Sequence, residues 1–281
     1  MVQMPGAFTP LSARLIERAG FPGVYVSGAV MSAELGLPDI GLTTLSEVAQ
    51  RAGQIARTTS LPVLVDADTG FGEPLNVART VQILEDAGVA ALHLEDQVNP
   101  KRCGHLDGKS VVDRESATRR IAAAVRARRD PSLLVVARSD ALASEGFEAM
   151  LDRLRAYVDA GADAVFPEAV TTLSDYERVR EALGVPVLAN MTEFGKSELF
   201  SASDLRSAGV GIVIYPVSLM RLSMGAVERA LSTLREEGSL ASLVPEMQTR
   251  ARLYEVLDYE SYGEYDDGIF TFTLPAGEPD E

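Results

Sequence analysis

The chain has 281 residues, of which 46% are hydrophobic and 24% charged, so one domain of barrel size with a large core is within its reach. The formal net charge of −15 argues against a general binder of nucleic-acid backbones, although a few arginines can still bind an anion locally. The single cysteine excludes a framework of intrachain disulfides. Neither a secretory leader nor an apolar run of membrane-spanning length is in view, so we expect a cytoplasmic protein that does not bind membranes.

Short β-rich runs alternate with longer amphipathic runs along the chain. The helical runs at 74–88 and 146–161 both end in Ala-Gly, a typical helix stop, and a strand follows each of them at once. Several strands are continuous apolar runs, as parallel strands covered on both faces are. The eight predicted strands are residues 2–7, 23–28, 62–68, 91–96, 133–140, 164–169, 186–192 and 211–216.

Eight strand–helix units predict an α/β fold, a (β/α)8 TIM-type barrel over residues 1–240. The alternative is an open doubly wound sheet, but the G-x-G-x-x-G turn of its dinucleotide-binding members is absent from the sequence. Residues 241–281 are expected to form a C-terminal helix and an acidic, Tyr-rich tail that pack on the barrel or on a neighbouring subunit.

Polar or ionisable side chains stand at the carboxyl end of six predicted strands. In a parallel barrel these ends meet on one face, which holds the active site of such enzymes. A plainer explanation is that strand ends are polar because they reach solvent, but it weakens when six strands share the pattern. The strand-end residues are Ser27, Asp66, Asp68, Glu95, Asp96, Arg138, Asp140, Glu168, Asn190 and Thr192.

Asp66 and Asp68 place two carboxylates two residues apart at a strand end. In extended backbone both side chains point the same way, and their repulsion favours a bound cation. Mg²⁺ takes one or two carboxylates and completes its octahedron with waters and substrate oxygens, and Mn²⁺ is a possible substitute. Glu95, on the neighbouring strand, would ligate the metal directly or hold its waters. The alternative is an ordinary turn, which Asp and Gly favour.

Arg138 ends a strand, where an unpaired buried guanidinium would be costly. A ligand with a carboxylate would satisfy it with two parallel hydrogen bonds. The alternative, which does not exclude the first, is an internal ion pair with Asp66, Asp140 or Glu168.

Three further residues have plain structural explanations. His93 lies within a predicted strand and is interpreted as a core histidine whose polar groups are satisfied. Arg221 and Arg250 have no context that separates them from ordinary surface arginines.

The only thiol, Cys103, lies in a polar loop between a strand and a helix, within the motif KRCGH. Positive neighbours lower the pKa of a thiol and favour the thiolate. Gly104 and Gly108 give the loop the freedom to move that a lid needs. Four roles are open, namely nucleophile, metal ligand, proton donor, or surface thiol without function. A structural zinc site is not among them, because one Cys and two His give too few ligands.

The chain resembles the isocitrate lyase/phosphoenolpyruvate mutase superfamily and, within it, the methylisocitrate lyases most closely. KRCGH is the most specific motif, since it resembles the catalytic loop of isocitrate and methylisocitrate lyases, and phosphonate-cleaving or mutase relatives generally lack its cysteine. Isocitrate lyases are considerably longer, so 281 residues favour the methylisocitrate type. The resemblance covers essentially the whole chain and is carried by GVYVSG, LGLPDIGLTTLSEV, VDADTGFGEPLNVARTV, HLEDQVNPKRCGH, ARSDA, FPEA, ANMTEFGKS, IYPVSLMRLSMGA and MQTRARLYEVLDY.

Two features depart from the family pattern. Family members usually read Ser-Gly-Gly-Gly where this chain reads Ser-Gly-Ala-Val, so Ala29 adds a methyl group where backbone usually approaches ligand. Substrate preference is the property that this methyl group would affect. The family normally has a helix before the first strand, whereas this chain starts almost at that strand.

The resemblance implies roles for individual residues. Asp66 and Asp68, with Glu95 close by, match the Mg²⁺ site. Cys103 matches the proton donor of the closing loop, and Tyr25 is a candidate base. Arg138 completes the catalytic set. The residues that match substrate-contacting positions are Ser27, Gly28, Ala29, Asp39, Cys103, Gly104, His105, Arg138, Glu168, Asn190, Thr192, Arg221 and Arg250.

The implied reaction is the cleavage of a small tricarboxylate, 2-methylisocitrate, to pyruvate and succinate, a retro-Claisen step of propionate catabolism in the methylcitrate cycle. The thiol of Cys103 would protonate the succinate carbanion equivalent. The first alternative is a related lyase or hydrolase acting on isocitrate, 2,3-dimethylmalate or oxaloacetate. The second, from a different class, is a non-catalytic barrel that serves binding or assembly. The family also implies a homotetramer that exchanges C-terminal helices.

Overall fold

All eight predicted strands are present in the computed structural model, which describes residues 1–102, 104, 108–195 and 197–271. Each observed strand lies within a predicted run, and all pair in parallel. The strands are β1 (Val2–Pro5), β2 (Val24–Val26), β3 (Val63–Asp66), β4 (Ala91–Glu95), β5 (Leu134–Ser139), β6 (Ala164–Pro167), β7 (Leu188–Asn190) and β8 (Ile212–Tyr215).

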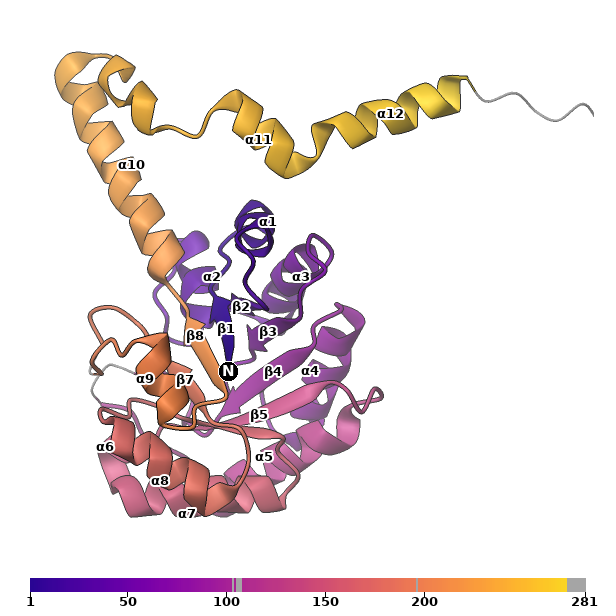
Figure 1. Cartoon of the computed structure of the whole chain (residues 1–281). Coiled ribbons are helices and arrows are strands. Elements are labelled where there is room, and N and C mark those ends of the chain that lie inside the picture. Colours follow the sequence, from indigo (N-terminus) through magenta and orange to yellow (C-terminus); the bar gives the residue numbers. More distant parts are fainter. Residues whose placement is uncertain (103, 105–107, 196, 272–281) are drawn as a thin grey trace, which may run out of the picture. The chain divides into compact units, whose positions relative to one another are not determined.

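The strands close into the predicted barrel. One sheet runs β2-β3-β4-β5-β6, and β8 stands between β1 and β7 in the other. Single bridges join the two sheets, from Gly6 to Tyr25 and from Val165 to Val187. The pairing of β1 with β8 shows a closed ring rather than an open doubly wound sheet, and helices surround the strands (Figure 1).

The helices begin and end where the local sequence allows. The predicted runs at 74–88 and 146–161 form α4 and α7, and each ends before a glycine with positive φ, Gly88 or Gly161. The helices from α1 to α10 are α1 (Pro10–Arg18), α2 (Gly28–Glu34), α3 (Leu45–Ala56), α4 (Pro74–Asp86), α5 (Arg114–Ala127), α6 (Leu142–Glu145), α7 (Phe147–Asp159), α8 (Leu173–Leu183), α9 (Ala202–Ser207) and α10 (Ser218–Glu237).

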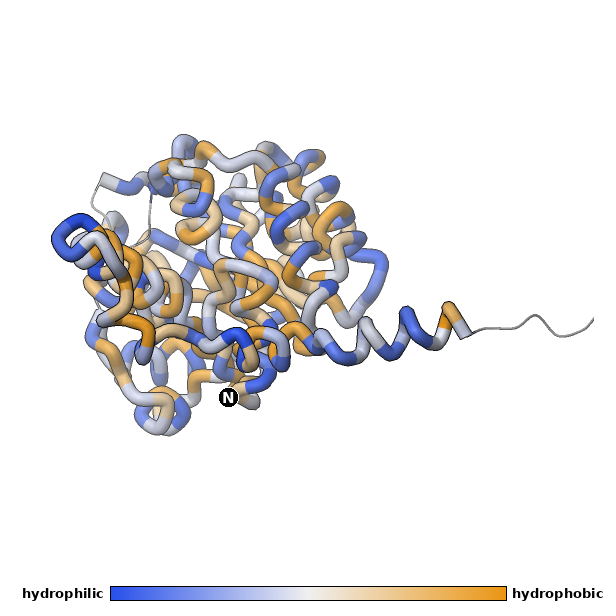
Figure 2. Tube along the Cα trace, turned by 90° about the horizontal axis from the view of Figure 1, so that it is seen from above, coloured by the Kyte–Doolittle hydropathy of each residue, from blue (hydrophilic) through white to orange (hydrophobic). Residues whose placement is uncertain are grey.

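Side chains of the strands alternate between two hydrophobic clusters. Val24 and Val26 of β2 face outward and pack with the helices, whereas Tyr25 between them faces the barrel interior. Figure 2 shows hydrophobic segments in the interior of the barrel and many hydrophilic ones at its outer turns. The inner cluster comprises Met4, Tyr25, Leu64, Ala91, Val136, Ala164, Phe166, Leu188 and Ile214.

The chain divides into two compact units, Met1–Ala226 and Val227–Glu281. The division falls within α10, and residue 240 as the end of the barrel domain stays a prediction. In the second unit, the acidic, Tyr-rich segment expected as a tail is a helix. The elements after α10 are η1 (Ala241–Glu246), α11 (Arg250–Leu257) and α12 (Tyr259–Phe270). No helix among the described residues has the length and apolarity to cross a bilayer.

Candidate active site

The candidate site is formed by side chains on the inner face of the barrel. Side chains two residues beyond an inner core residue point to the same face, so Leu64 is followed by Asp66, and Val136 by Arg138. They line a cavity of about 80 Å³. The predicted residues that line this cavity are Tyr25, Ser27, Ala29, Asp39, Asp66, Gly104, Arg138, Glu168, Asn190, Thr192 and Arg221.

The remaining predicted residues have different outcomes. Gly28 and Glu95 contact cavity residues, since the Gly28 amide donates to Asp66 Oδ2 at 3.2 Å and Glu95 Oε2 lies 3.2 Å from Arg138. Arg250 begins α11 in the second compact unit and stays a prediction. Cys103 and His105 lie outside the described residues, so their assignments stay predictions too.

The two aspartates approach each other differently from the prediction. Asp66 ends β3, but Asp68 has φ +45° and lies in a turn, so the backbone is not extended between them. The turn brings the Asp68 amide to Asp66 Oδ1 at 2.9 Å. Burial and the neighbouring Asp66 carboxylate raise the pKa of Asp68 to about 6. The two carboxylates therefore come close together by a geometry other than the extended one that we expected, and their role in holding a metal stays a prediction.

Lys101 is a site residue that the sequence analysis considered only as a neighbour of the thiol. Its buried Nζ lies 2.5 Å from Asp39 Oδ1 and 2.7 Å from Asp68 Oδ1. Although burial opposes its charge, the carboxylates of Asp68 and Glu95 raise the pKa of Lys101. The KRCGH motif contains this lysine, but only the fold shows that its side chain reaches the carboxylates.

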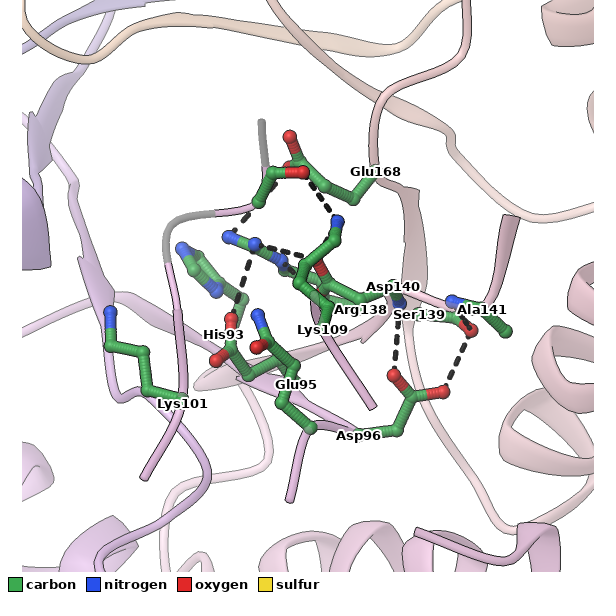
Figure 3. A network of polar contacts seen from close by, with 12 residues as sticks. His93, Glu95, Asp96, Lys101, Lys109, Arg138, Ser139, Asp140, Ala141 and Glu168 are labelled. Carbon is green, nitrogen blue, oxygen red and sulfur yellow. Dashed lines mark hydrogen bonds and ion pairs between the residues drawn. The ribbon is translucent and has the colours of Figure 1, made fainter. Parts of the chain in front are cut away.

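Arg138 forms internal ion pairs with several carboxylates (Figure 3). Its Nε and NH2 donate to the two oxygens of Asp140 at 2.8 and 3.0 Å. NH2 also lies 3.2 Å from Glu95, and NH1 lies 3.7 Å from Glu168. The predicted pairs with Asp140 and Glu168 are thus present, and no pair with Asp66 is recorded among the described residues.

Tyr25 and His93 form a hydrogen-bonded pair inside the barrel. The Tyr25 hydroxyl lies 2.8 Å from His93 Nε2, and His93 Nδ1 lies 3.7 Å from Asp66 Oδ1. Burial lowers the pKa of His93 to about 4, and burial together with Asp66 raises the pKa of Tyr25 well above its ordinary value. Near neutral pH both rings are therefore uncharged, which constrains how Tyr25 could act as a base.

Asp96 supports the site from outside the barrel interior. Glu95 faces inward, so the next residue faces outward. Asp96 accepts hydrogen bonds from Ser139 Oγ at 2.7 Å, the Asp140 amide at 2.9 Å and Tyr157 Oη at 2.9 Å. It thereby ties the end of β4 to the end of β5 and to α7, which fixes the backbone that carries Asp140.

Two glycines allow backbone to approach charged groups closely. A Cβ on Gly28 would lie 2.8 Å from Asp66 Oδ2, and one on Gly104 would lie 2.5 Å from Arg138 NH2. Glu168 would be almost as close to the latter, at 2.6 Å. The Gly104 peptide therefore lies directly against the guanidinium and carboxylate of the site.

The residues present fit Mg²⁺ held largely through water. No group of three His, Cys, Asp or Glu side chains in the described part of the chain is arranged to chelate an ion. Mg²⁺ needs only one or two carboxylates, and Glu95 Oε1 is buried without a hydrogen-bond partner among the described residues. Among the described residues, the cations paired with these carboxylates are Lys101, beside Asp68, and Arg138, beside Glu95, and each also pairs with a further carboxylate. This excess of carboxylate suits a divalent cation.

A second, larger cavity of about 730 Å³ lies between β1, α1 and the start of α10. Its lining contains Phe8, Leu15 and Leu219 and no charged side chain. It offers neither acid, base nor metal ligand, so the chemistry belongs to the smaller polar cavity.

The phosphoenolpyruvate phosphomutase family model matches residues 1–235. The chain belongs to this family. Two curated members are similar over nearly the whole chain. The "probable 2-methylisocitrate lyase 2" of Corynebacterium glutamicum is 57% identical over 99% of this chain and 91% of its own. The 2-methylisocitrate lyase of Salmonella typhimurium is 48% identical over 96% of this chain and 92% of its own.

Solved structures of the family share the barrel and differ in named activity. An oxaloacetate acetylhydrolase bound to 3,3-difluorooxalacetate has a TM-score of 0.91 at 36% identity, and a 2,3-dimethylmalate lyase has 0.90 at 37%. Each alignment covers 98% of this chain and 94% of the other. A phosphonopyruvate hydrolase in complex with oxalate and Mg²⁺ has 0.85 at 29%, covering 95% and 93%.

Proposed function

We propose that this protein is a carbon–carbon lyase that cleaves 2-methylisocitrate to pyruvate and succinate. The observation that carries the proposal is the small polar cavity, where Arg138 and Lys101 face the carboxylates of Asp66 and Glu168 at the strand ends. Such a cavity suits a hydroxylated polycarboxylate. The high identity to relatives named 2-methylisocitrate lyase narrows the choice among such acids.

Mg²⁺, with Mn²⁺ as a substitute, would be held by Asp66 and Asp68, with Glu95 close by. When bound, it supplies a Lewis acid that makes the 2-hydroxyl of the substrate more acidic. The phosphonopyruvate hydrolase bound to Mg²⁺ supports the assignment. The buried, unpaired Glu95 oxygen supports it from within this chain.

The reaction requires a base for the hydroxyl proton. Tyr25 is protonated near neutral pH, so it can accept this proton only by passing its own to His93, with which it shares a hydrogen bond. The electron pair of the broken carbon–carbon bond then goes to the succinate fragment. The thiol of Cys103 would protonate that carbon, as the sequence predicts.

Binding and orientation fall to the remaining polar residues. Arg138 and Arg221 would hold substrate carboxylates, and the Asn190 amide would complete the cradle. To do so, Arg138 must share its guanidinium between the substrate and Asp140, since its Nε and NH2 already bind that carboxylate. Pre-formed ion pairs of this kind keep the guanidinium in place before substrate arrives.

A pyruvate-coupled assay tests the proposal. 2-Methylisocitrate with Mg²⁺ should release equal amounts of pyruvate and succinate, and isocitrate, 2,3-dimethylmalate and oxaloacetate should be turned over at least about tenfold less efficiently. A preference for one of those acids would point to the related lyase or hydrolase. No turnover of any of the four would favour a non-catalytic barrel.

Further parts of the proposal concern setting and assembly. We place the enzyme in the cytoplasm, as the sequence leads us to expect, and in propionate catabolism through the methylcitrate cycle, as the family resemblance implies. A homotetramer that exchanges C-terminal helices is supported by exposed apolar residues on the last helix, among them Tyr262, Tyr265, Ile269 and Phe270.

A further inference from the structure

Lys109 is a buried cation that the proposed reaction does not use. Its side chain is 3% exposed, and it does not line the cavity. Its Nζ donates to the Gly104 carbonyl and, at 2.9 Å, to Asp140 Oδ1. A buried ammonium loses its hydration, so two strong acceptors in fixed positions are needed to keep it there.

Asp140 is shared between Lys109 and the guanidinium of the site. Its Oδ1 accepts from both Lys109 Nζ and Arg138 NH2, and its Oδ2 accepts from Arg138 Nε (Figure 3). The Asp140 amide is fixed in turn by Asp96. One immobile carboxylate therefore sets the positions of two cations from different parts of the chain.

The second acceptor of Lys109, the Gly104 carbonyl, belongs to backbone that also lies beside Arg138. The Gly104 peptide stands so close to the guanidinium that a Cβ there would lie 2.5 Å from Arg138 NH2. Lys109 thus binds the backbone that covers Arg138 and also the carboxylate that orients Arg138. Gly104 follows Cys103 directly in the sequence.

We propose that Lys109 is a positioning residue, which holds the Gly104 peptide against Arg138 and keeps Asp140 in the orientation that aims Arg138 into the cavity. The inference rests on the proposed function, because the readout of positioning is turnover. Lys109 acts through Gly104 and Asp140 and does not touch substrate. Loss of the Lys109 side chain should therefore lower kcat more than it changes KM.

The test compares Lys109→Met with Lys109→Arg. In Lys109→Met, kcat should fall about 10- to 100-fold while KM changes less than about threefold, since small misplacements of catalytic groups have effects of this size. Lys109→Arg keeps a cationic donor and should recover kcat to within about fivefold of the parent. Arg119→Met, which removes an exposed cation paired with Glu115, is the control and should match the parent.

Hydrogen exchange of the unliganded protein gives a second readout that needs no turnover. Peptides containing Gly104 should exchange at least about tenfold faster in Lys109→Met than in the parent or in Arg119→Met. If the parent fails to cleave 2-methylisocitrate, the proposed function fails, while this exchange difference still tests the hold on Gly104.

Three results would overturn the inference. Unchanged kcat in Lys109→Met would show that Lys109 only stabilises the fold, whatever happens to the melting temperature. A lower kcat with unchanged exchange at Gly104 would show that it acts by another route. Failure of Lys109→Arg to recover kcat in a folded protein would show that a cation bridging Gly104 and Asp140 is not the requirement.

Discussion

At the mouth of the barrel, the backbone of single residues lies directly against charged side chains. Gly104 is the clearest example, because no side chain fits between its backbone and the guanidinium of Arg138. Gly104→Ala should lower kcat about 10- to 100-fold without lowering the melting temperature, since the methyl group displaces the peptide from Arg138. Gly225→Ala, where a Cβ meets open space, is the matched control. Equal kcat values for the two variants would show that the close approach is dispensable.

Cys103 is predicted to deliver a proton to carbon. Cys103→Ser has a hydroxyl that is a far weaker acid, so turnover should fall at least about 100-fold in the pyruvate-coupled assay. The melting temperature and Mg²⁺ affinity should stay at parental values, because neither depends on the thiol. Near-normal turnover in the serine variant would refute the acid role.

Asp68 is the metal-site residue with the most crowded electrostatic surroundings, between Asp66 and Lys101. Asp68→Ala should weaken Mg²⁺ binding, measured by calorimetry, at least about tenfold and abolish metal-dependent turnover. Asp152→Ala removes an exposed carboxylate paired with Arg155 and should leave both the Mg²⁺ affinity and the turnover unchanged. Full activity of the parent protein in excess chelator would contradict the metal assignment.

Buried charged side chains connect secondary-structure elements at the ends of β4 and β5. Burial opposes ionisation of Asp140, but Arg138 and Lys109 lower its pKa to about 2. A carboxyl whose folded pKa lies below its unfolded value of 3.8 stabilises the fold above that value and loses the contribution as pH falls towards 2. The contribution at neutral pH is about 2 kcal/mol.

The stability difference between the parent and Asp140→Asn should therefore depend on pH. Urea unfolding at pH 5 and pH 3 should show this difference shrinking by about 1 kcal/mol at the lower pH, since Asp140 is by then largely protonated in the unfolded chain. A difference that stays constant would mean that Asp140 has an ordinary pKa in the folded protein.

Sequence patterns predicted the elements better than the contacts among them. The strands could be predicted because buried parallel strands are continuous apolar runs, and their polar ends then had to meet on one face. The extended geometry assumed for Asp68 was wrong, because the chain turns directly after Asp66. The reach of Lys101 and Lys109 into the site could not be predicted, since it depends on where a loop crosses the barrel.

The helix α12 shows another limit of local patterns. Its segment carries acidic residues, four aromatic residues and the glycines Gly263 and Gly268, which lower helix propensity, so a tail was the natural expectation. The structure nevertheless forms a helix from Tyr259 to Phe270. Helix formation across these residues leaves large apolar side chains exposed in this chain.

At the scale of the whole molecule, these exposed side chains predict association. Ile269 and Phe270 are 59% and 82% exposed, and such apolar surface usually marks a contact with another chain. The double variant Ile269→Ser/Phe270→Ser should have a lower mass than the parent in light scattering at about micromolar concentration. Glu264→Ser/Asp267→Ser changes exposed polar positions of the same helix and is the control. Equal masses for all three proteins would contradict the assembly proposal.

Side chains along each strand alternate between the inner and the outer face of the barrel, so substitutions at the two kinds of position have different effects. A substitution at an inner position such as Glu95 or Glu168 changes the surroundings of Arg138, whereas one at Asp96 removes hydrogen bonds that join β4 to β5 and α7. Deletion of one residue earlier in β4 would reverse the faces of the residues that follow. Glu95 would then point outward, and the carboxylate of Asp96 would point into the cavity. New substrate preferences are therefore expected to arise by replacement at inner positions and in the connecting loops, with strand lengths preserved.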